Sequence, residues 1–265
     1  MDDWKMVLLA IVQGLTEFLP VSSSGHLVVA NALLSAAVGR PLPDLVEVSI
    51  FLHLGTLLSI LVFYRRRILR LLGADRRVAA LLLVGTLPAV AMALLLEAFA
   101  SHLLESPLLA GLMFPATAVL LIVSSRRDPG EVDYTSLTWP RALLIGAAQA
   151  VAILPGVSRS GATIAAGLLL GLRRDSATAF AFLLAIPAIA GAVVLQLWKM
   201  SHTSAATSVG LLTLGAAIAF VVGLAALTLL TKLVTHGRLH WFAWWLVPLG
   251  AAVTAWQLTM LFSSG

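Results

Sequence analysis

Residues 6–38 read MVLLAIVQGLTEFLPVSSSGHLVVANALLSAAV, and residues 142–172 read ALLIGAAQAVAILPGVSRSGATIAAGLLLGL. Both stretches are apolar at their ends and are broken in the middle, at 20–25 and at 155–161. Each flanking leg holds about 12–14 residues, which makes about 20 Å of helix against a hydrocarbon core of about 30 Å. The legs are too short to cross, so both stretches are predicted to be re-entrant hairpins. Non-helical backbone at membrane depth needs protein or water beside it, so both breaks are expected to line a wet site.

The composition indicates a membrane protein. Of the 265 residues, 60% are hydrophobic and 11% are charged, whereas soluble domains carry about 25% charged residues. The mean hydropathy is +1.01. The chain has no cysteine, which excludes disulfides and thiolate chemistry. The net charge of +5 comes from basic residues in short loops, a distribution that sets membrane topology and does not indicate a nucleic-acid partner.

Six further apolar segments are long enough to span a bilayer. They are 45–64, 78–96, 107–124, 177–198, 208–231 and 241–262. Alternating spans place thirteen of the 17 Lys and Arg residues on one side, which is therefore expected to be cytoplasmic. The predicted fold class is an all-α polytopic membrane protein, with six spanning helices and two re-entrant hairpins in a single membrane domain, 1–265.

The two hairpins resemble each other in sequence. A shift of 136 residues aligns Gln13 with Gln149, and it aligns the run Val21–Gly25 with Val157–Gly161, with Arg159 in place of Ser23. The first hairpin is expected to enter from outside and the second from the cytoplasm. A hairpin followed by three spans, repeated with opposite entry, predicts an inverted-topology repeat of about 1–125 and 140–265.

Ionisable side chains at membrane depth are costly and usually face a functional cavity. Glu17, His26, His53 and Arg159 are the candidates, and three of them lie in or beside the breaks. We expect Gln13 to share a helix face with Glu17. A carboxylate, an imidazole and neighbouring hydroxyls could supply a base, a proton carrier and a nucleophile. These hydroxyls belong to Ser22, Ser23 and Ser24.

Structural explanations compete with these roles. Glu17 could serve only as an ion-pair partner of Arg159, and Ser24 could cap the helix that follows the break. We interpret His53 as a polar packing residue more readily than as a catalytic one. The tryptophans lie mostly near predicted interfaces and are interpreted as membrane anchors.

The second break has the features of an anion site. Arg159 offers a bidentate guanidinium, and the start of the next half-helix offers free N–H groups and a positive dipole end. The predicted phosphate-binding set is Ser22, Ser24, Ser158, Ser160, Gly161 and Thr163. From these residues alone the anion could be a phosphate or a transported anion.

The segments Gln13–His26 and Pro155–Thr163 closely resemble the two signature motifs of the undecaprenyl-diphosphate phosphatase family, which is associated with bacitracin resistance. The resemblance covers the whole chain in length, span order and motif placement. It implies hydrolysis of undecaprenyl diphosphate to the monophosphate at the outer side of the bacterial plasma (inner) membrane. That reaction recycles the lipid carrier for peptidoglycan synthesis, cell-wall biogenesis and cell shape.

The resemblance also implies individual roles. Glu17 matches the second acidic position, Ser23 the nucleophile, His26 the motif histidine and Arg159 the phosphate-binding arginine. Gln13 stands where the family has an acidic residue or Gln, and it is given a supporting role. One arginine does not neutralise a diphosphate, so Mg²⁺ or Ca²⁺ is expected to bridge Glu17 and the substrate phosphates.

In the hypothesis that follows, Ser23 attacks the terminal phosphorus, Glu17 or His26 takes its proton, and Arg159 stabilises the transferring phosphoryl group. Attack by His26, or by water activated by Glu17 or His26, is left open. The alternative function is a membrane carrier or flippase for an anionic lipid phosphate, because inverted repeats with paired hairpins also suit alternating access. The expected partners are the polyprenyl diphosphate substrate and membrane lipids. A homodimer is also left open.

Overall fold

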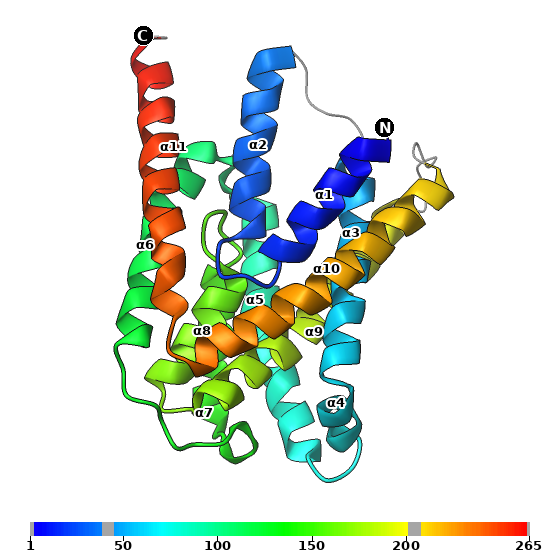
Figure 1. The fold of residues 1–265 in the computed structure, drawn as a ribbon, viewed down its shortest axis with the longest axis vertical. Coiled ribbons are helices and arrows are strands. Elements are labelled where there is room, and N and C mark those ends of the chain that lie inside the picture. Colours follow the sequence, from blue (N-terminus) through cyan, green and yellow to red (C-terminus); the bar gives the residue numbers. More distant parts are fainter. Residues whose placement is uncertain (1–2, 39–44, 201–207, 264–265) are drawn as a thin grey trace.

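The computed structural model describes residues 3–38, 45–200 and 208–263, and these are almost entirely helical. Figure 1 shows the helices gathered into one bundle. The first half holds α1 (Asp3–Thr16), α2 (Ser23–Val38), α3 (Leu45–Phe63), α4 (Arg65–Leu71), α5 (Arg76–Phe99), η1 (Ser101–Glu105) and α6 (Pro107–Ser125). The second half holds η2 (Tyr134–Ser136), α7 (Trp139–Val151), α8 (Arg159–Leu169), α9 (Arg174–Met200), α10 (Val209–Thr235), η3 (Leu239–Phe242) and α11 (Ala243–Ser263).

The all-α, multi-pass prediction is confirmed. Among the described residues, five helical segments are long and apolar enough to cross a membrane, and a sixth is added if α3 and α4 are taken as one bent span. The five are Arg76–Phe99, Pro107–Ser125, Arg174–Trp198, Val209–Thr235 and Leu239–Phe262. The number that cross, and the re-entrant character of the two short pairs, stay predictions.

The basic residues after the first span were expected in a short connecting loop, and part of this connection is helical. Residues Arg65–Leu71 form α4, which is bent by 78° from the helix before it. Arginine and leucine are good helix formers, and the segment contains neither glycine nor proline. The chain leaves helical geometry at Tyr64, and the bend there turns the four arginines of α4 away from the direction of α3.

The two broken stretches each fold as a pair of short helices. In Figure 1, α1 and α2 meet at a turn and both extend toward the end where α11 finishes, whereas α7 and α8 lie toward the opposite end. The turns use left-handed backbone at Ser22 (φ 67°) and Gly156 (φ 90°). The first helix of each pair ends four residues before a proline, at Thr16 and Val151, and Pro20 and Pro155 prevent the helix from continuing through the turn.

The tips of the two pairs touch. The N–H of Gly156 donates to Ser22 Oγ at 3.1 Å, and a Cβ placed on Gly25 would lie 2.6 Å from that same nitrogen. Thr117 on α6 secures the second tip, donating to the Gly156 carbonyl at 2.9 Å and accepting from the Ser158 N–H at 3.3 Å. The two breaks are therefore fixed against each other inside the bundle.

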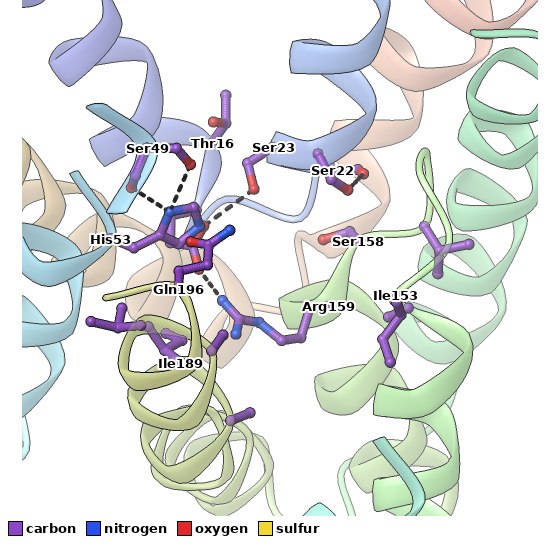
Figure 2. Close-up of a pocket in the computed structure, with 17 residues that line it drawn as sticks. Thr16, Ser22, Ser23, Ser49, His53, Ile153, Ser158, Arg159, Ile189 and Gln196 are labelled. Carbon is purple, nitrogen blue, oxygen red and sulfur yellow. Dashed lines mark hydrogen bonds and ion pairs between the residues drawn. The ribbon is translucent and has the colours of Figure 1, made fainter. Parts of the chain in front are cut away.

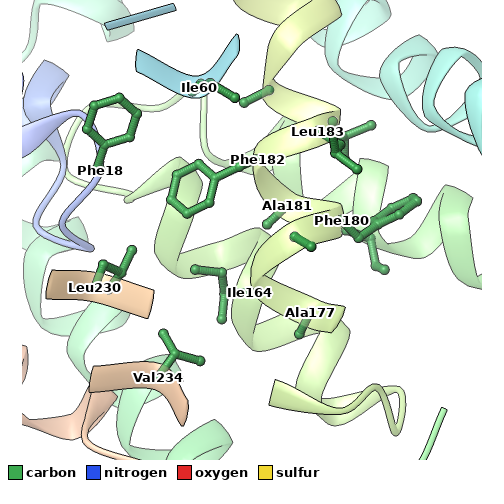
Figure 3. Packing of buried hydrophobic residues seen from close by; sticks show 14 of the residues in the cluster. Phe18, Ile60, Ile164, Ala177, Phe180, Ala181, Phe182, Leu183, Leu230 and Val234 are labelled. Atoms are coloured by element: carbon green, nitrogen blue, oxygen red, sulfur yellow. The ribbon is translucent and has the colours of Figure 1, made fainter. Parts of the chain in front are cut away.

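Helix α9 is the central element. Its apolar window is 56% buried, against 17% for the segment Leu239–Phe262. Phe18, in the first break, packs edge-to-face on Phe182 of α9 with ring centroids 5.7 Å apart (Figure 3). Phe18 is fully buried, so this contact holds the segment that carries Glu17 against the centre of the bundle.

The connection between α6 and α7 is tied to α9. Asp133 accepts hydrogen bonds from the N–H and hydroxyl of Thr135, at 2.9 and 2.7 Å, and from Ser176 Oγ at 2.9 Å. Burial alone would raise the pKa of the Asp133 carboxyl, but these bonds hold the pKa below its ordinary value. This carboxylate fixes the loop at the arginine-rich end of the bundle.

Candidate active site

A polar cavity of about 300 Å³ lies where the hairpin tips meet. Its walls come from both breaks and from α3 and α9, and Figure 2 shows the side chains that face it. The polar lining residues are Thr16, Glu17, Ser22, Ser23, Ser24, Ser49, His53, Ser158, Arg159 and Gln196. The predicted wet site between the two breaks therefore exists as a cavity.

Glu17 is the anionic centre of the cavity. Its side chain is only 2% exposed, and its Oε1 is paired with Nη2 of Arg159. Its Oε2 accepts hydrogen bonds from Gln13 Nε2 at 3.0 Å and from Ser23 Oγ at 3.2 Å. A buried carboxylate needs such partners to stay charged, and both oxygens have them.

His53 joins this network from α3. Its Nδ1 lies 2.7 Å from the Ser49 carbonyl oxygen, so the hydrogen-bond network assigns the proton to Nδ1. The other ring nitrogen then accepts from Gln13 Nε2 at 3.3 Å and lies 3.6 Å from Glu17 Oε2. The amide of Gln13 can thus donate one hydrogen to the carboxylate and one to the imidazole.

Ser23 is the hydroxyl in direct contact with the carboxylate. It lies at the start of α2, lines the cavity, and donates to Glu17 at a distance suited to proton transfer. Ser22 has another task, because its hydroxyl accepts from the N–H of Gly25 and so caps α2. The cap is therefore at Ser22 and not at Ser24, which keeps its hydroxyl on the cavity wall 3.4 Å from that of Ser22.

Arg159 is the cationic side of the site. It is the first residue of α8, and its guanidinium extends from that helix toward the wall on which His53 and Ser49 lie (Figure 2). Ser158 caps α8 by accepting from the N–H of Gly161 at 3.1 Å. The start of α8 and the side chain of Arg159, which is 27% exposed, both face the cavity, an arrangement that favours an anion.

Three residues of the expected phosphate-binding set have partners within the fold and do not line the main cavity. Ser160 Oγ lies 3.5 Å from the Leu19 carbonyl oxygen, Gly161 donates its N–H to the cap, and Thr163 Oγ1 donates to the Arg159 carbonyl at 2.8 Å. Their contribution to phosphate binding stays a prediction. In this arrangement they shape the turn and the first turn of α8.

His26 lies outside the main cavity. Its Nδ1 is 2.7 Å from the Ser22 carbonyl oxygen, and its Nε2 accepts from the indole N–H of Trp245 at 3.0 Å. The imidazole lies between the rings of Phe114 and Trp245, with centroid distances of 5.2 and 6.1 Å. Of the two predicted proton acceptors, the geometry brings only Glu17 to Ser23.

The residues fit a divalent cation only in part. Within the described ranges, no group of three His, Cys, Asp or Glu residues could hold a metal ion by itself. Glu17 Oε1 is held by Arg159, and Oε2 already accepts hydrogen bonds from Gln13 and Ser23, so an ion at Oε2 would share that oxygen with them. One carboxylate oxygen beside a polar cavity suits an ion that takes its remaining ligands from water and from substrate phosphates.

The polar cavity adjoins an apolar groove. Ser24, Ser49 and Gln196 line both spaces. The groove has a volume of about 380 Å³, and its other lining residues are Leu9, Gln13, Leu27, Val28, Val48, Leu52 and Leu104. A ligand with an anionic head and an apolar tail would find both environments in contact.

Sequence reasoning missed the participation of three side chains. His53 was interpreted as packing, and Ser49, which supports it one helical turn earlier, was not considered. Trp245 was interpreted as a membrane anchor, yet it holds His26. The signal for the first pair was available, because Ser49 and His53 are four residues apart and share one face of a mostly apolar span. The partner of His26 had no such signal.

Comparison with known proteins gives consistent results. The sequence profile of the family described as bacitracin resistance protein BacA matches residues 6–252. An undecaprenyl-diphosphatase of Rhodopirellula baltica is 49% identical over 256 residues, which cover 96% of this chain and 98% of the relative. The undecaprenyl-diphosphatase of Desulfosudis oleivorans is 41% identical over 277 residues, covering 97% and 98%. That of Methanosphaera stadtmanae is 34% identical over 273 residues, covering 94% and 96%. Because the profile and the relatives extend across both hairpins and nearly all of the chain, the protein belongs to the bacitracin resistance protein BacA family.

Proposed function

We propose that this protein is an undecaprenyl-diphosphatase, which hydrolyses undecaprenyl diphosphate to undecaprenyl phosphate and inorganic phosphate. The observation that carries the proposal is the contact of the Ser23 hydroxyl with the buried carboxylate of Glu17, which is itself paired with Arg159. A nucleophile, its base and a cation for the phosphoryl group meet at one point. The activity named for its relatives in the family agrees with this chemistry.

The shape of the site suits a prenyl diphosphate. The diphosphate would lie in the polar cavity, facing Arg159 and the start of α8. The first isoprene units would lie in the adjoining groove, against Leu27 and Leu52. This placement keeps the charged head in a wet site while the tail stays in apolar surroundings.

The reaction proceeds through Ser23 in this proposal. Its Oγ forms a bond to the terminal phosphorus while the bond from that phosphorus to the bridging oxygen breaks. The electron pair of the broken bond leaves with undecaprenyl phosphate, and the proton of Ser23 passes to Glu17. Glu17 next passes this proton to the departing undecaprenyl phosphate. Water then attacks the phosphoserine and gives its proton to Glu17, which returns it to Ser23 Oγ as the bond between that oxygen and phosphorus breaks. Inorganic phosphate leaves, and the serine hydroxyl and the carboxylate are both restored.

Arg159 has two roles in succession. Without substrate it neutralises Glu17, which is nearly inaccessible to solvent. A diphosphate carries more negative charge than one carboxylate and competes for the guanidinium, which then stabilises the transferring phosphoryl group.

A divalent cation, Mg²⁺ or Ca²⁺, is part of the proposal as a substrate-bridged ion. Glu17 would be its protein ligand, and the ion would supply the charge neutralisation that a single arginine cannot give to a diphosphate. Gln13 and His53 would keep the carboxylate oriented toward Ser23 through the contacts described above.

The bacterial plasma membrane is the proposed location, with the arginine-rich loops in the cytoplasm. The groove and the cavity open beside α1 and α2, whose outer ends lie opposite those loops (Figure 1). We therefore propose that the diphosphate is taken from the outer leaflet, where its hydrolysis returns the carrier lipid for peptidoglycan synthesis. A homodimer remains an expectation that the mass of the purified protein in detergent would test.

Phosphate release from undecaprenyl diphosphate by the purified protein, with and without EDTA, tests the function. Loss of release in Arg159→Ala and Glu17→Gln, with folded protein in each case, is the expected result. Ser23→Ala should lower kcat by at least about 10²-fold. The loss of kcat in Ser24→Ala should be at least about tenfold smaller than the loss in Ser23→Ala, because Ser24 does not contact Glu17. Failure to trap a phosphoserine, with substantial turnover left in Ser23→Ala, would refute the covalent step.

A carrier or flippase for an anionic lipid phosphate is the competing function. A carrier has no need for a hydroxyl held on a buried carboxylate, and this contact favours hydrolysis. If a folded, monodisperse parent released no phosphate but moved lipid phosphate across liposomes, and Ser23→Ala transported equally well, the carrier would be the better account.

A further inference from the structure

A second cavity lies between α6 and α11, far in sequence from the hairpin residues that form the active site. It has a volume of about 720 Å³. Its lining residues are Ile122, Ser125, Arg126, His240, Ala243, Trp244, Val247, Pro248 and Ala251. None of them lines the active-site cavity or the groove beside it. In Figure 1, α6 and α11 run side by side along one flank of the bundle.

The cavity is apolar along its length and polar at one end. The apolar wall comes from α11, where Val247, Pro248 and Ala251 follow one another at helical spacing, and from Ile122 of α6. The polar end is formed by Ser125 and Arg126, at the close of α6, and by His240 in η3. The cavity therefore pairs an apolar channel with a cationic mouth.

The polar end has donors that are not used within the fold. Ser125 Oγ is buried and makes no hydrogen bond to any residue that the structure describes. Across the same described ranges, the side chains of Arg126 and His240 have no hydrogen-bond or ion-pair partner. A buried hydroxyl without a partner is costly, and a ligand that accepts its hydrogen bond would remove that cost.

We propose that this cavity binds an anionic membrane phospholipid, whose phosphate contacts Arg126 and Ser125 and whose acyl chain lies along Val247 and Ala251. An arginine offers two N–H groups to a phosphate, and basic pockets between membrane helices on the cytoplasmic side suit anionic head groups. The end of α6 belongs to the arginine-rich side of the bundle, so the lipid comes from the cytoplasmic leaflet. Trp244, 84% exposed at the mouth, is an interfacial residue by position and type.

The proposed ligand is phosphatidylglycerol, an anionic phospholipid, and the apolar channel favours it over a soluble phosphate. Inorganic phosphate could use the donors but would leave the wall formed by α11 uncovered. A zwitterionic lipid could use the wall, but it places a second positive charge beside Arg126. Charge and shape together select a lipid with net negative charge.

Lipid titration of the full-length protein in detergent, followed by native mass spectrometry, tests the proposal. Phosphatidylglycerol is expected to bind at one saturable site more tightly than phosphatidylcholine of the same chains. Arg126→Gln should weaken that binding about tenfold, as expected for the loss of a charge-assisted hydrogen bond. Arg127→Gln is the matched control, since Arg127 carries the same charge one residue later and does not line the cavity.

A second variant tests the contribution of the apolar channel separately from that of the Arg126 charge. Ala251→Leu narrows the apolar channel and should weaken binding of phosphatidylglycerol while Arg126 is intact. Both variants should keep the parent elution profile and phosphatase activity, because neither position touches the active site. Equal binding of the two lipids by the parent, or equal losses in Arg126→Gln and Arg127→Gln, would overturn the proposal. Displacement of phosphatidylglycerol by stoichiometric undecaprenyl phosphate would overturn the choice of occupant.

Discussion

Neutralising each partner of the ion pair between Glu17 and Arg159 should destabilise the protein to different extents. The Glu17 side chain is 2% exposed, whereas that of Arg159 is 27% exposed and faces a cavity that can hold water. Arg159→Gln therefore leaves an uncompensated charge in the interior. Glu17→Gln leaves a guanidinium that solvent in the cavity can stabilise. The free energy of unfolding should fall more when the less exposed charge, that of Glu17, is left without its partner.

The magnitudes follow from this asymmetry. Breaking a fully buried pair costs about 3–5 kcal/mol, and the donors Gln13 and Ser23 that remain on Glu17 place Arg159→Gln near the lower limit, about 3 kcal/mol. Glu17→Gln should cost about 1–2 kcal/mol, the value of a charge-assisted hydrogen bond lost beside water. The double variant removes both charges and should cost only about 2 kcal/mol, so the two positions are coupled by about 2–3 kcal/mol.

Thermal unfolding in one detergent, with phosphate release measured on the same preparations, provides the test. At about 2–4 °C per kcal/mol for proteins of this size, Arg159→Gln should lower Tm by ~6–12 °C and Glu17→Gln by ~2–8 °C. The double variant should melt above Arg159→Gln. All three should lose at least about 10²-fold in activity, because each lacks the base or the phosphate-binding cation. Additive losses of Tm, or a larger loss in Glu17→Gln, would refute the reasoning.

Three other substitutions have defined outcomes. Gly25→Ala should separate the hairpin tips, because its Cβ would lie 2.6 Å from the amide nitrogen of Gly156, and both Tm and phosphate release should fall; retention of both would contradict the packing. Asp133 has a lowered pKa, so its stabilising effect is present above its unfolded pKa of about 4 and is lost as the pH falls. Tm of the parent, and of the exposed control Asp128→Asn, should therefore drop more steeply below about pH 5 than Tm of Asp133→Asn; parallel curves would exclude this role. Gln13→Glu adds a carboxylate beside the proposed ion, so half-maximal activity should need about fivefold less divalent cation, and an unchanged requirement would argue against an ion at this position.

The features that could be predicted from the sequence depend on local chemistry. Proline, glycine and serine in the middle of an apolar stretch interrupt a helix wherever it lies, so both breaks were identifiable. The pairing of Glu17 with Arg159 was offered only as a structural alternative to catalysis, and the structure shows the ion pair within the cavity. The apolar lengths were also sufficient to place the long helices, since backbone hydrogen bonds must be satisfied within each segment.

The features that could not be predicted depend on how helices are rotated and packed. The spacing of Ser49 and His53 places both on one face of α3, but nothing in the sequence indicated that this face is turned toward Gln13 and Glu17. His26 is separated from Trp245 by 219 positions, and only the packing of α11 beside the first hairpin brings the rings together. The helix at Arg65–Leu71 escaped notice because charge was taken as the mark of a loop.

The repeat assignment stays a prediction, but the contacts within the two breaks support it and explain how the site became asymmetric. The shift of 136 residues pairs Ser22 with Ser158, and each caps the helix after its break by accepting from a glycine N–H three residues on. The same shift pairs Glu17 with Ile153 and Ser23 with Arg159, and all four line one cavity.

The serines that cap the helices after the two breaks are thus equivalent in the two halves, whereas the residues proposed to act on the substrate differ. The first half supplies the base and the hydroxyl, and the second supplies the cation. A symmetric cavity with two carboxylates or two arginines would place like charges together, which is unfavourable in a buried site. Divergence at the pairs Glu17/Ile153 and Ser23/Arg159 avoids that repulsion and leaves one carboxylate, one hydroxyl and one guanidinium at the contact between the hairpins. Transferring the arginine to the first half, by the double exchange Ser23→Arg and Arg159→Ser, would preserve the total charge but remove the hydroxyl that contacts Glu17. Such a variant should therefore be inactive even if it folds.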